Sequence, residues 1–413
     1  MSVSKSLPAC PAAIVEVSMN NRWNKVIAYM TAFVMFVSIS MLVSCSSAPE
    51  QTDVPKESAE HENNENLIIP AFNPIYYYDG LLYYIKKPLG TPALLYYIDP
   101  ENGESGILCG KPDCTHDSEE CNACLDSIGD GFTVYRDKIY WLSRSIIDRK
   151  LMCEDIDGTN RQEVMALDKE SEWLTSNMPF VEIYKDTLYR CGCGSFVSDG
   201  EAKKTMLLYC QPLQKGSEPK YLYKVEDVSS VVARIHENQL YFAVTGSEYD
   251  LSICVCDLDS GEVRELYKKD KMDNMPFDIA VYEDKLILHG VGPCVSIYSL
   301  TDGSYEVIGK EGHDFYATTG ANIYEPTGQK DYCLYDMSGD MISQGEVDPP
   351  GFEESNYTQR YLGSIKETML FLFEASYESK KFPGLAAMHS YIAAFNTDTL
   401  EWKILWDGIS DYE

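Results

Sequence analysis

The sequence is poor in basic residues and in histidine. Its 413 residues include 34 Lys and Arg against 65 Asp and Glu, a formal net charge of −31, and six His. So acidic a chain repels polyanions, and this argues against nucleic acid and anionic lipid headgroups as partners of the folded part. The charge is compatible with cationic partners or divalent ions, and it also keeps an exported domain soluble.

Local catalytic motifs are missing from the printed sequence as well. It contains no Gly-x-Ser-x-Gly elbow, no P-loop, no His-Glu-x-x-His pair and no sialidase-type Asp-box. The stretch DIDGTN, at 155–160, resembles the start of a calcium loop but lacks the Glu required at the twelfth position. Nothing local therefore predicts an enzyme.

One long apolar run is present, from Val26 to Val43. Arg22 and Lys25 precede it, which is the pattern of a secretory signal, although about 20 apolar residues also suffice for a transmembrane anchor. Its ending, Leu42-Val43-Ser44-Cys45, resembles the lipobox of bacterial lipoproteins. The resemblance implies that residues 1–45 contain a lipoprotein signal peptide and that Cys45 carries the lipid. Glu16 lies in an unusually long leading segment, so Met19 is an alternative start.

Residues 46–66 contain no aromatic and almost no aliphatic side chain. Such a segment cannot bury enough apolar surface to offset the entropy of ordering it. We therefore expect a disordered tether between a lipid anchor and a folded domain at 67–413. This organisation places the domain at the extracytoplasmic face of a bacterial membrane.

Two hairpin patterns recur along the domain. The first, as in VYRDKIYWL from Val134 and VYEDKLILH from Val281, joins two apolar strands by a two-residue polar turn. The second, as in ICVCDLDSGEVREL from Ile253, appears seven times at intervals of roughly 40 to 55 residues, the range of propeller blades. The repeats predict an all-β, seven-bladed β-propeller of four-stranded antiparallel blades, with a pair of β-sandwiches as the alternative. Ring closure stays open, since NLIIPAF from Asn66 could complete the last blade, yet LEWKILW from Leu400 already supplies an outer strand.

Most of the 14 cysteines fall at strand positions that hold apolar residues in other repeats. A buried cysteine behaves as a small hydrophobe, so we expect these side chains to pack in the core. They are Cys153, Cys191, Cys193, Cys210, Cys254, Cys256, Cys294 and Cys333.

The stretch CGKPDCTHDSEECNAC, at 109–124, has no counterpart in the other repeats and is an insert after the first blade. Cys109, Cys114, His116 and Cys121 form a Cys3His set, which suits a closed, structural zinc site, with Cys124 as a substitute ligand. Disulfides among the four cysteines are the alternative, because oxidised thiols persist outside the membrane. Redox chemistry at Cys121 and Cys124 is a third hypothesis, but no helix start is predicted there.

The chain from Cys45 onward resembles exported lipoproteins of Gram-positive, Clostridia-like bacteria with a low-density-lipoprotein-receptor-like β-propeller. The insert residues Cys109, Pro112, Asp113, Cys114, His116 and Cys121 carry this resemblance.

We expect a cell-surface lipoprotein that binds a protein, peptide or glycan through its propeller face without catalysis. The alternative is an exported glycan lyase or hydrolase with a site at the channel mouth, since a propeller can assemble a site from distant loops. A purely structural envelope protein is a third hypothesis. A cluster of His, Arg, Tyr and carboxylates at the channel mouth would favour the enzyme.

Overall fold

The structure is a computed structural model. It describes residues 67–68, 75–86, 93–118, 120–125, 132–143, 149–167, 180–198, 201–272, 275–290, 295–308, 317–327, 330–347, 357–378 and 386–408. All of these residues belong to one compact unit, Ala59–Glu413. The predicted signal peptide at 1–45, the lipidation site Cys45 and the tether at 46–66 therefore lie outside the described residues. No helix among the described residues is long and apolar enough to cross a membrane.

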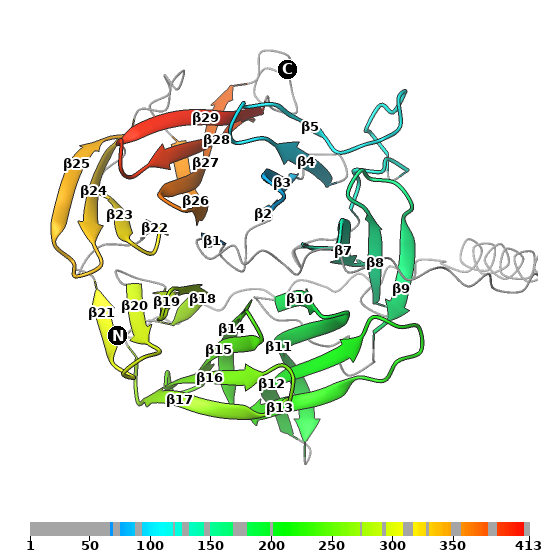
Figure 1. Cartoon of the computed structure of the whole chain (residues 1–413), viewed down its shortest axis with the longest axis vertical. Coiled ribbons are helices and arrows are strands. Elements are labelled where there is room, and N and C mark those ends of the chain that lie inside the picture. The colour runs from blue at the N-terminus through cyan, green and yellow to red at the C-terminus, as the bar shows by residue number, and fades with distance from the viewer. Residues whose placement is uncertain are drawn as a thin grey trace, which may run out of the picture. The chain divides into compact units, whose positions relative to one another are not determined.

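Seven antiparallel sheets form the blades of a β-propeller, as predicted (Figure 1). Blade 1 contains β2 (Ile75–Tyr78), β3 (Leu81–Lys86), β4 (Leu94–Ile98) and β5 (Ser105–Ile107). Blade 2 contains β6 (Phe132–Tyr135), β7 (Lys138–Leu142), β8 (Lys150–Asp155) and β9 (Gln162–Ala166). Blade 3 contains β10 (Phe180–Tyr184), β11 (Thr187–Ser198), β12 (Glu201–Pro212) and β13 (Lys220–Glu226).

The remaining blades repeat this order of strands. Blade 4 contains β14 (Val228–His236), β15 (Gln239–Gly246), β16 (Leu251–Asp257) and β17 (Val263–Lys269). Blade 5 contains β18 (Pro276–Tyr282), β19 (Lys285–Gly290), β20 (Val295–Ser299) and β21 (Tyr305–Ile308). Blade 6 contains β22 (Ala317–Thr318), β23 (Asn322–Pro326), β24 (Asp331–Asp336) and β25 (Met341–Glu346). Blade 7 contains β26 (Tyr357–Ile365), β27 (Thr368–Glu378), β28 (Ala386–Asn396) and β29 (Glu401–Gly408).

The two-residue turns between the first and second strands explain the recurring polar pairs. In the hairpin of blade 2, Arg136 and Asp137 have φ angles of 48° and 58°, and in blade 3 Lys185 and Asp186 have 46° and 55°. Both central residues of such a turn need positive φ to match the twist of the strands, and Asp tolerates this conformation well. Local turn chemistry therefore sets the register of these two inner hairpins.

Hydrophobic clusters between the blades hold the ring together. Strand side chains alternate between the two faces of a blade, so each face packs against one neighbour. Seven clusters form in this way, one at each junction between successive blades and one between blade 7 and blade 1. Burial of apolar area at these junctions is the main favourable contribution to folding.

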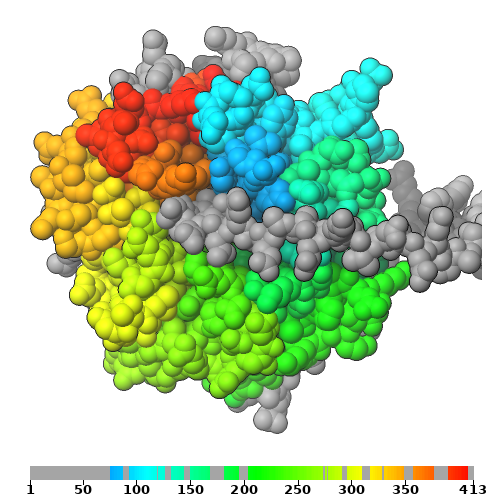
Figure 2. Space-filling model, viewed as in Figure 1, coloured from blue at the N-terminus to red at the C-terminus, as the bar shows by residue number. Residues whose placement is uncertain are grey.

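Side-chain packing between blade 1 and blade 7 closes the ring. Leu82 and Ile98 of blade 1 pack with Leu372 and Trp406 of blade 7. The ring of Trp406 lies 5.9 Å from that of Tyr84, and Figure 2 shows blade 1 in blue and cyan beside blade 7 in red and orange. The outer strand of blade 7 is its own β29, as LEWKILW suggested.

The short strand β1 (Leu67–Ile68) pairs with the inner edge of blade 7. Leu67 is opposite Ile365 and Ile68 is opposite Ser364, so this sheet has five strands in the order β1-β26-β27-β28-β29. β1 also contacts β18 of blade 5. Leu67 and Ile68 of the NLIIPAF segment thus add an inner strand to the last blade instead of completing its outer edge.

The predicted core cysteines that the structure describes do pack between blades. Cys191, Cys193, Cys254 and Cys256 are buried at the junction of blades 3 and 4, and Cys210 packs against them. Cys153 is buried between blades 2 and 3, and Cys333 packs between blades 5 and 6. Burial raises the pKa of the Cys254 thiol to about 12, so this group stays protonated and behaves as a hydrophobe. Cys294 lies outside the described residues.

Candidate metal centre

The insert lies between β5 and β6 and is fastened to blade 1. At the end of the insert the backbone returns alongside β4: the N–H of Leu95 donates to the carbonyl of Ala123 at 2.8 Å. The N–H of Leu125 donates to the carbonyl of Ala93 at 3.2 Å, and Leu94 forms an isolated bridge with Cys124. The C-terminal end of the insert is therefore held beside blade 1, in the cyan segment next to β8 in Figure 1.

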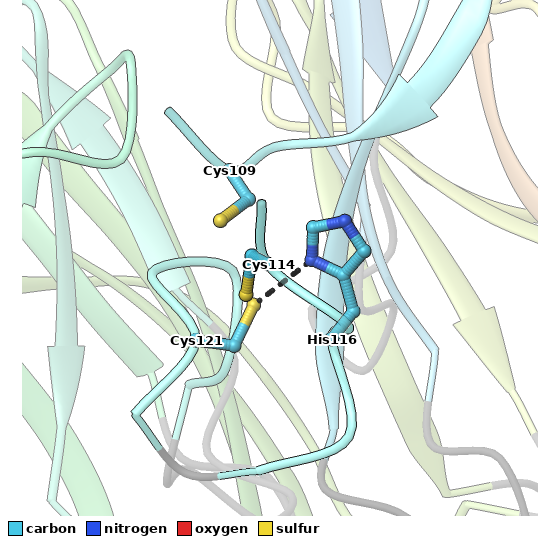
Figure 3. Close-up of side chains that lie close together, drawn as sticks. All are labelled: Cys109, Cys114, His116 and Cys121. Atoms are coloured by element: carbon cyan, nitrogen blue, oxygen red, sulfur yellow. Dashed lines mark hydrogen bonds between the residues drawn. The ribbon is translucent and has the colours of Figure 1, made fainter. Parts of the chain in front are cut away.

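The structure brings the four predicted ligands together. The sulfur atoms of Cys109, Cys114 and Cys121 and a ring nitrogen of His116 lie within 4.8 Å of one another. His116 Nδ1 is 3.3 Å from the Cys121 sulfur, and Figure 3 shows the four side chains converging from separate parts of the loop. Cys121 is buried and the other three ligands are half-buried, so water has limited access to the centre.

Tight turns bring these side chains to one point. The N–H of Cys114 donates to the carbonyl of Lys111 at 3.3 Å, which closes the turn at Pro112 and Asp113 expected from the sequence. His116 has a φ of 57°, in the left-handed region. A further turn is closed by the N–H of Cys124, which donates to the carbonyl of Cys121 at 3.0 Å.

The surroundings shift the pKa values of two of the thiols, Cys109 and Cys121, in opposite directions. Burial opposes ionisation of Cys109, but hydrogen bonds from the backbone N–H groups of Lys111 and Asn122 outweigh it and hold its pKa below the ordinary value. Burial and the nearby Cys114 and Cys109 raise the pKa of Cys121 to about 12, against the lowering effect of the Ala123 N–H. A bound divalent cation would overcome the raised pKa of Cys121, since a thiol that coordinates a metal ion is deprotonated outright.

The donor set fits zinc. Zinc takes four Cys and His ligands tetrahedrally, at about 2.3 Å for sulfur and about 2.0 Å for nitrogen, which places ligand atoms about 3.5 to 3.8 Å apart. The observed 3.3 Å between His116 Nδ1 and the Cys121 sulfur is close to this spacing. Soft thiolates with an imidazole disfavour magnesium and calcium, which prefer oxygen ligands.

Cys124, the predicted substitute ligand, does not belong to the four-ligand group. Its backbone bridges to Leu94, and its side chain is buried in a hydrophobic cluster with Leu94 and Ala123. The eleven described cysteines carry no disulfide. Oxidation of the insert remains a prediction that a thiol count tests directly.

Sequence reasoning missed two charged residues of blade 2 beside the insert. Arg161 donates to the Glu154 carboxylate at 2.9 Å and to the carbonyl of Asn122 at 2.6 Å. Burial raises the pKa of Glu154 to about 7 despite the opposing charge of Arg161. The repeats did carry a signal, because Glu154 occupies the core position that five of the six other second hairpins fill with apolar or aromatic residues: Ile98, Cys256, Tyr298, Tyr335 and Phe395.

Polar side chains also lie on the inner strands around the channel. Arg234 of β14 pairs with Glu182 of β10 at 3.1 Å, which links blades 3 and 4. Burial, aided by the charge of Glu182, raises the pKa of Tyr76 on β2 to about 12. These groups were not predicted, and only the deviation of Glu182 and Arg234 from the apolar strand pattern marks them in the sequence.

A second polar group joins blades 5 to 7. His289 Nδ1 of β19 is 3.6 Å from Asp278 Oδ2 of β18, and both side chains are buried. The Tyr361 ring centroid is 6.0 Å from that of His289, and the Tyr361 hydroxyl donates to the carbonyl of Thr318 at 2.6 Å. A carboxylate, an imidazole and a phenol thus meet near the inner strands, although all three are closed off from solvent.

No protein-family model matches the sequence, and no curated protein matches it either. Solved structures do share its fold. A prolyl endopeptidase matches with a TM-score of 0.54 and 11% identity, covering 84% of this chain and 51% of that chain. A puromycin-hydrolyzing peptidase of Mycobacterium tuberculosis matches with a TM-score of 0.50 and 8% identity, covering 86% of this chain and 56% of that chain.

The chain spans about half the length of these peptidase chains. A nidogen–laminin complex also matches, with a TM-score of 0.39 and 11% identity, covering 64% of this chain and 92% of that chain, which is too distant to support an argument. Likeness at these identities establishes the propeller fold alone. Membership of the low-density-lipoprotein-receptor-like lipoproteins therefore stays a prediction.

Proposed function

We propose that this chain is a lipid-anchored binding module at the extracytoplasmic face of a bacterial membrane. Lipid on Cys45 would hold it to the membrane, and residues 46–66 would act as the tether. The propeller would bind a protein, peptide or glycan through loops that a stiff scaffold displays.

The closed ring is the observation that carries this proposal. Each blade is joined to both neighbours by a buried hydrophobic cluster, including the junction of blade 7 with blade 1. The inner-strand charges are largely engaged with one another, as Arg234 is with Glu182. A ring of this kind supports a binding surface without requiring its channel groups to take part in chemistry.

Within the same proposal, zinc occupies the Cys3His insert and has a structural role. The convergence of Cys109, Cys114, His116 and Cys121 supports it. Four protein ligands leave no open position for substrate, so the ion would cross-link the loop rather than catalyse a reaction. Binding of zinc would then order this edge of the junction between blades 1 and 2.

An exported glycan lyase or hydrolase is the second candidate, favoured by the group formed by Asp278, His289 and Tyr361. A carboxylate beside an imidazole is the arrangement that general acid–base catalysis uses. Burial of all three side chains argues against this role, because a substrate would need the inner strands to open before it could reach them.

One experiment separates the two candidates. The full chain, purified in detergent, is applied to peptide and glycan arrays, and each ligand bound is then incubated with it and examined for cleavage. Saturable binding of an unaltered ligand supports the binding module. Turnover that is lost in His289→Asn refutes it and supports the enzyme.

Anchoring is tested separately by feeding cells labelled palmitate. The parent should carry the label and fractionate with the membrane, whereas Cys45→Ala should lose the label. Equal labelling of both proteins would refute the lipid anchor on Cys45.

A further inference from the structure

Arg161 of blade 2 reaches across to the insert that follows blade 1. It lies on the connection between β8 and β9, and its guanidinium donates to the carbonyl of Asn122 at 2.6 Å. Asn122 follows the ligand Cys121 directly, so this hydrogen bond meets the loop beside the metal-binding sulfur atoms.

The peptide group that Arg161 holds is also the one that contacts a ligand. The carbonyl of Asn122 and the N–H of Ala123 belong to the same peptide unit, and the Ala123 N–H donates to the Cys121 sulfur. A hydrogen bond accepted by the carbonyl of a peptide group polarises its N–H, so hydrogen bonds in such a chain strengthen one another. A stronger N–H donor stabilises a thiolate in the same way as it stabilises other anions.

Glu154 fixes where the guanidinium points. Its carboxylate accepts from Arg161 Nε at 2.9 Å and is fully buried. The Arg161 guanidinium also lies 5.2 Å from the ring centroid of the buried Trp141, which limits its freedom further. A long, flexible side chain is thereby presented in one orientation.

The turn of blade 2 that carries Arg161 is pressed against the insert. A Cβ added to Gly158 would lie 3.0 Å from the carbonyl oxygen of Leu108 and 3.4 Å from the Asn122 Cβ. Gly158 has a φ of 76°, so the turn uses glycine both for its conformation and for this approach. The contact between blade 2 and the metal loop is therefore built into the backbone.

We propose that Arg161, oriented by Glu154, is a positioning residue of the metal centre and that metal binding and docking of the insert on blade 2 strengthen each other. The proposal rests on the metal centre proposed above. Three thiolates and a divalent cation leave a net charge of about −1 at the site, which a neighbouring guanidinium favours. Partners that orient ligands indirectly are typically worth about 10- to 100-fold in metal affinity.

The test uses cobalt(II), whose absorption bands report how many thiolates bind it. The full chain in detergent is reduced, freed of metal and titrated without oxygen against a competing chelator. Arg161→Met is compared with Arg161→Lys and with Arg136→Met. Arg136 is a matched control, because it also lies on blade 2 but forms an exposed ion pair with Asp186 of blade 3, at 2.7 Å, instead of meeting the insert.

The expected result is one cobalt ion per parent chain with three sulfur ligands. Arg161→Met should bind it about 10- to 100-fold more weakly with the same number of thiolates at saturation, and its sulfur charge-transfer band should shift. The cobalt affinity of Arg161→Lys should lie between those of the parent and Arg161→Met, and the affinity of Arg136→Met should equal that of the parent.

Equal affinity of the parent and Arg161→Met would overturn the proposal while leaving the metal centre intact. If Arg161→Met does not fold, Arg161→Lys decides instead, and parental affinity in that variant would overturn it. A parent chain that binds no cobalt would refute the metal centre itself.

Discussion

Replacement of Glu154 by glutamine should change how the stability of the propeller depends on pH. Glu154 is fully buried between blades 1 and 2, and burial raises the pKa of its carboxyl from 4.5 to about 7 in the folded chain. Between these pH values the folded chain binds more protons at this site than the unfolded chain does. The contribution of Glu154 to the free energy of unfolding of the parent therefore falls as pH rises through this window.

The magnitude follows from the same two values. At 1.36 kcal/mol per pH unit, a rise from 4.5 to about 7 corresponds to about 3 kcal/mol of destabilisation above pH 7. Glutamine resembles the protonated acid in shape and does not ionise. Glu154→Gln should therefore match the parent near pH 4.5 and exceed its stability by about 3 kcal/mol near pH 8.

Urea unfolding at a series of pH values, with a chelator present throughout, measures this difference. Glu163→Gln is the matched control, because Glu163 is an exposed partner of Lys150 on the same blade. The control should show a pH profile parallel to that of the parent. If the difference between Glu154→Gln and the parent stayed constant from pH 4.5 to 8, the buried carboxyl would not be the cause and the reasoning would fail.

Two further substitutions test packing. Gly158→Ala should lower the free energy of unfolding more than Gly80→Ala does. Both glycines have positive φ, which costs alanine about 1–2 kcal/mol, but of the two only Gly158 has an atom within 4 Å of the added Cβ. Equal losses in urea unfolding would contradict the contact of Gly158 with Leu108. Phe371→Ala should lower the free energy of unfolding by about 3–5 kcal/mol, because this side chain is fully buried between blades 6 and 7. Tyr249→Ala is the control: this side chain is 58% exposed, so its loss should change the free energy of unfolding by less than about 0.5 kcal/mol. Similar losses in these two variants would refute the assigned interface.

The blades were predictable because the information that forms them is local. Six of the seven inner hairpins contain a two-residue turn, such as Arg136-Asp137, between alternating apolar residues, so these repeats specify the same unit. The Cys3His set was predictable for a related reason, since Cys109, Cys114, His116 and Cys121 are close in sequence and nothing in the other repeats accounts for them.

Contacts between distant segments were not predictable in the same way. β1 is two residues long, and its pairing with Ser364 and Ile365 depends on the completed ring rather than on any pattern of its own. The hydrogen bond from Arg161 to Asn122 joins residues on different structural units, and only Glu154, an acid at an apolar position, hinted at it. Sequence spacing alone left Cys124 as a substitute ligand, and the structure groups the other four side chains without it.

Metal content of the protein purified without chelator tests the central claim most directly, measured on the parent, Cys121→Ala and Cys124→Ala. The account predicts one zinc ion per chain in the parent and in Cys124→Ala, and none in Cys121→Ala, because Cys121 lies in the four-ligand group and Cys124 does not. A parent chain without metal, in which thiol titration misses the four cysteines of the insert, would contradict the metal centre and establish disulfides in its place.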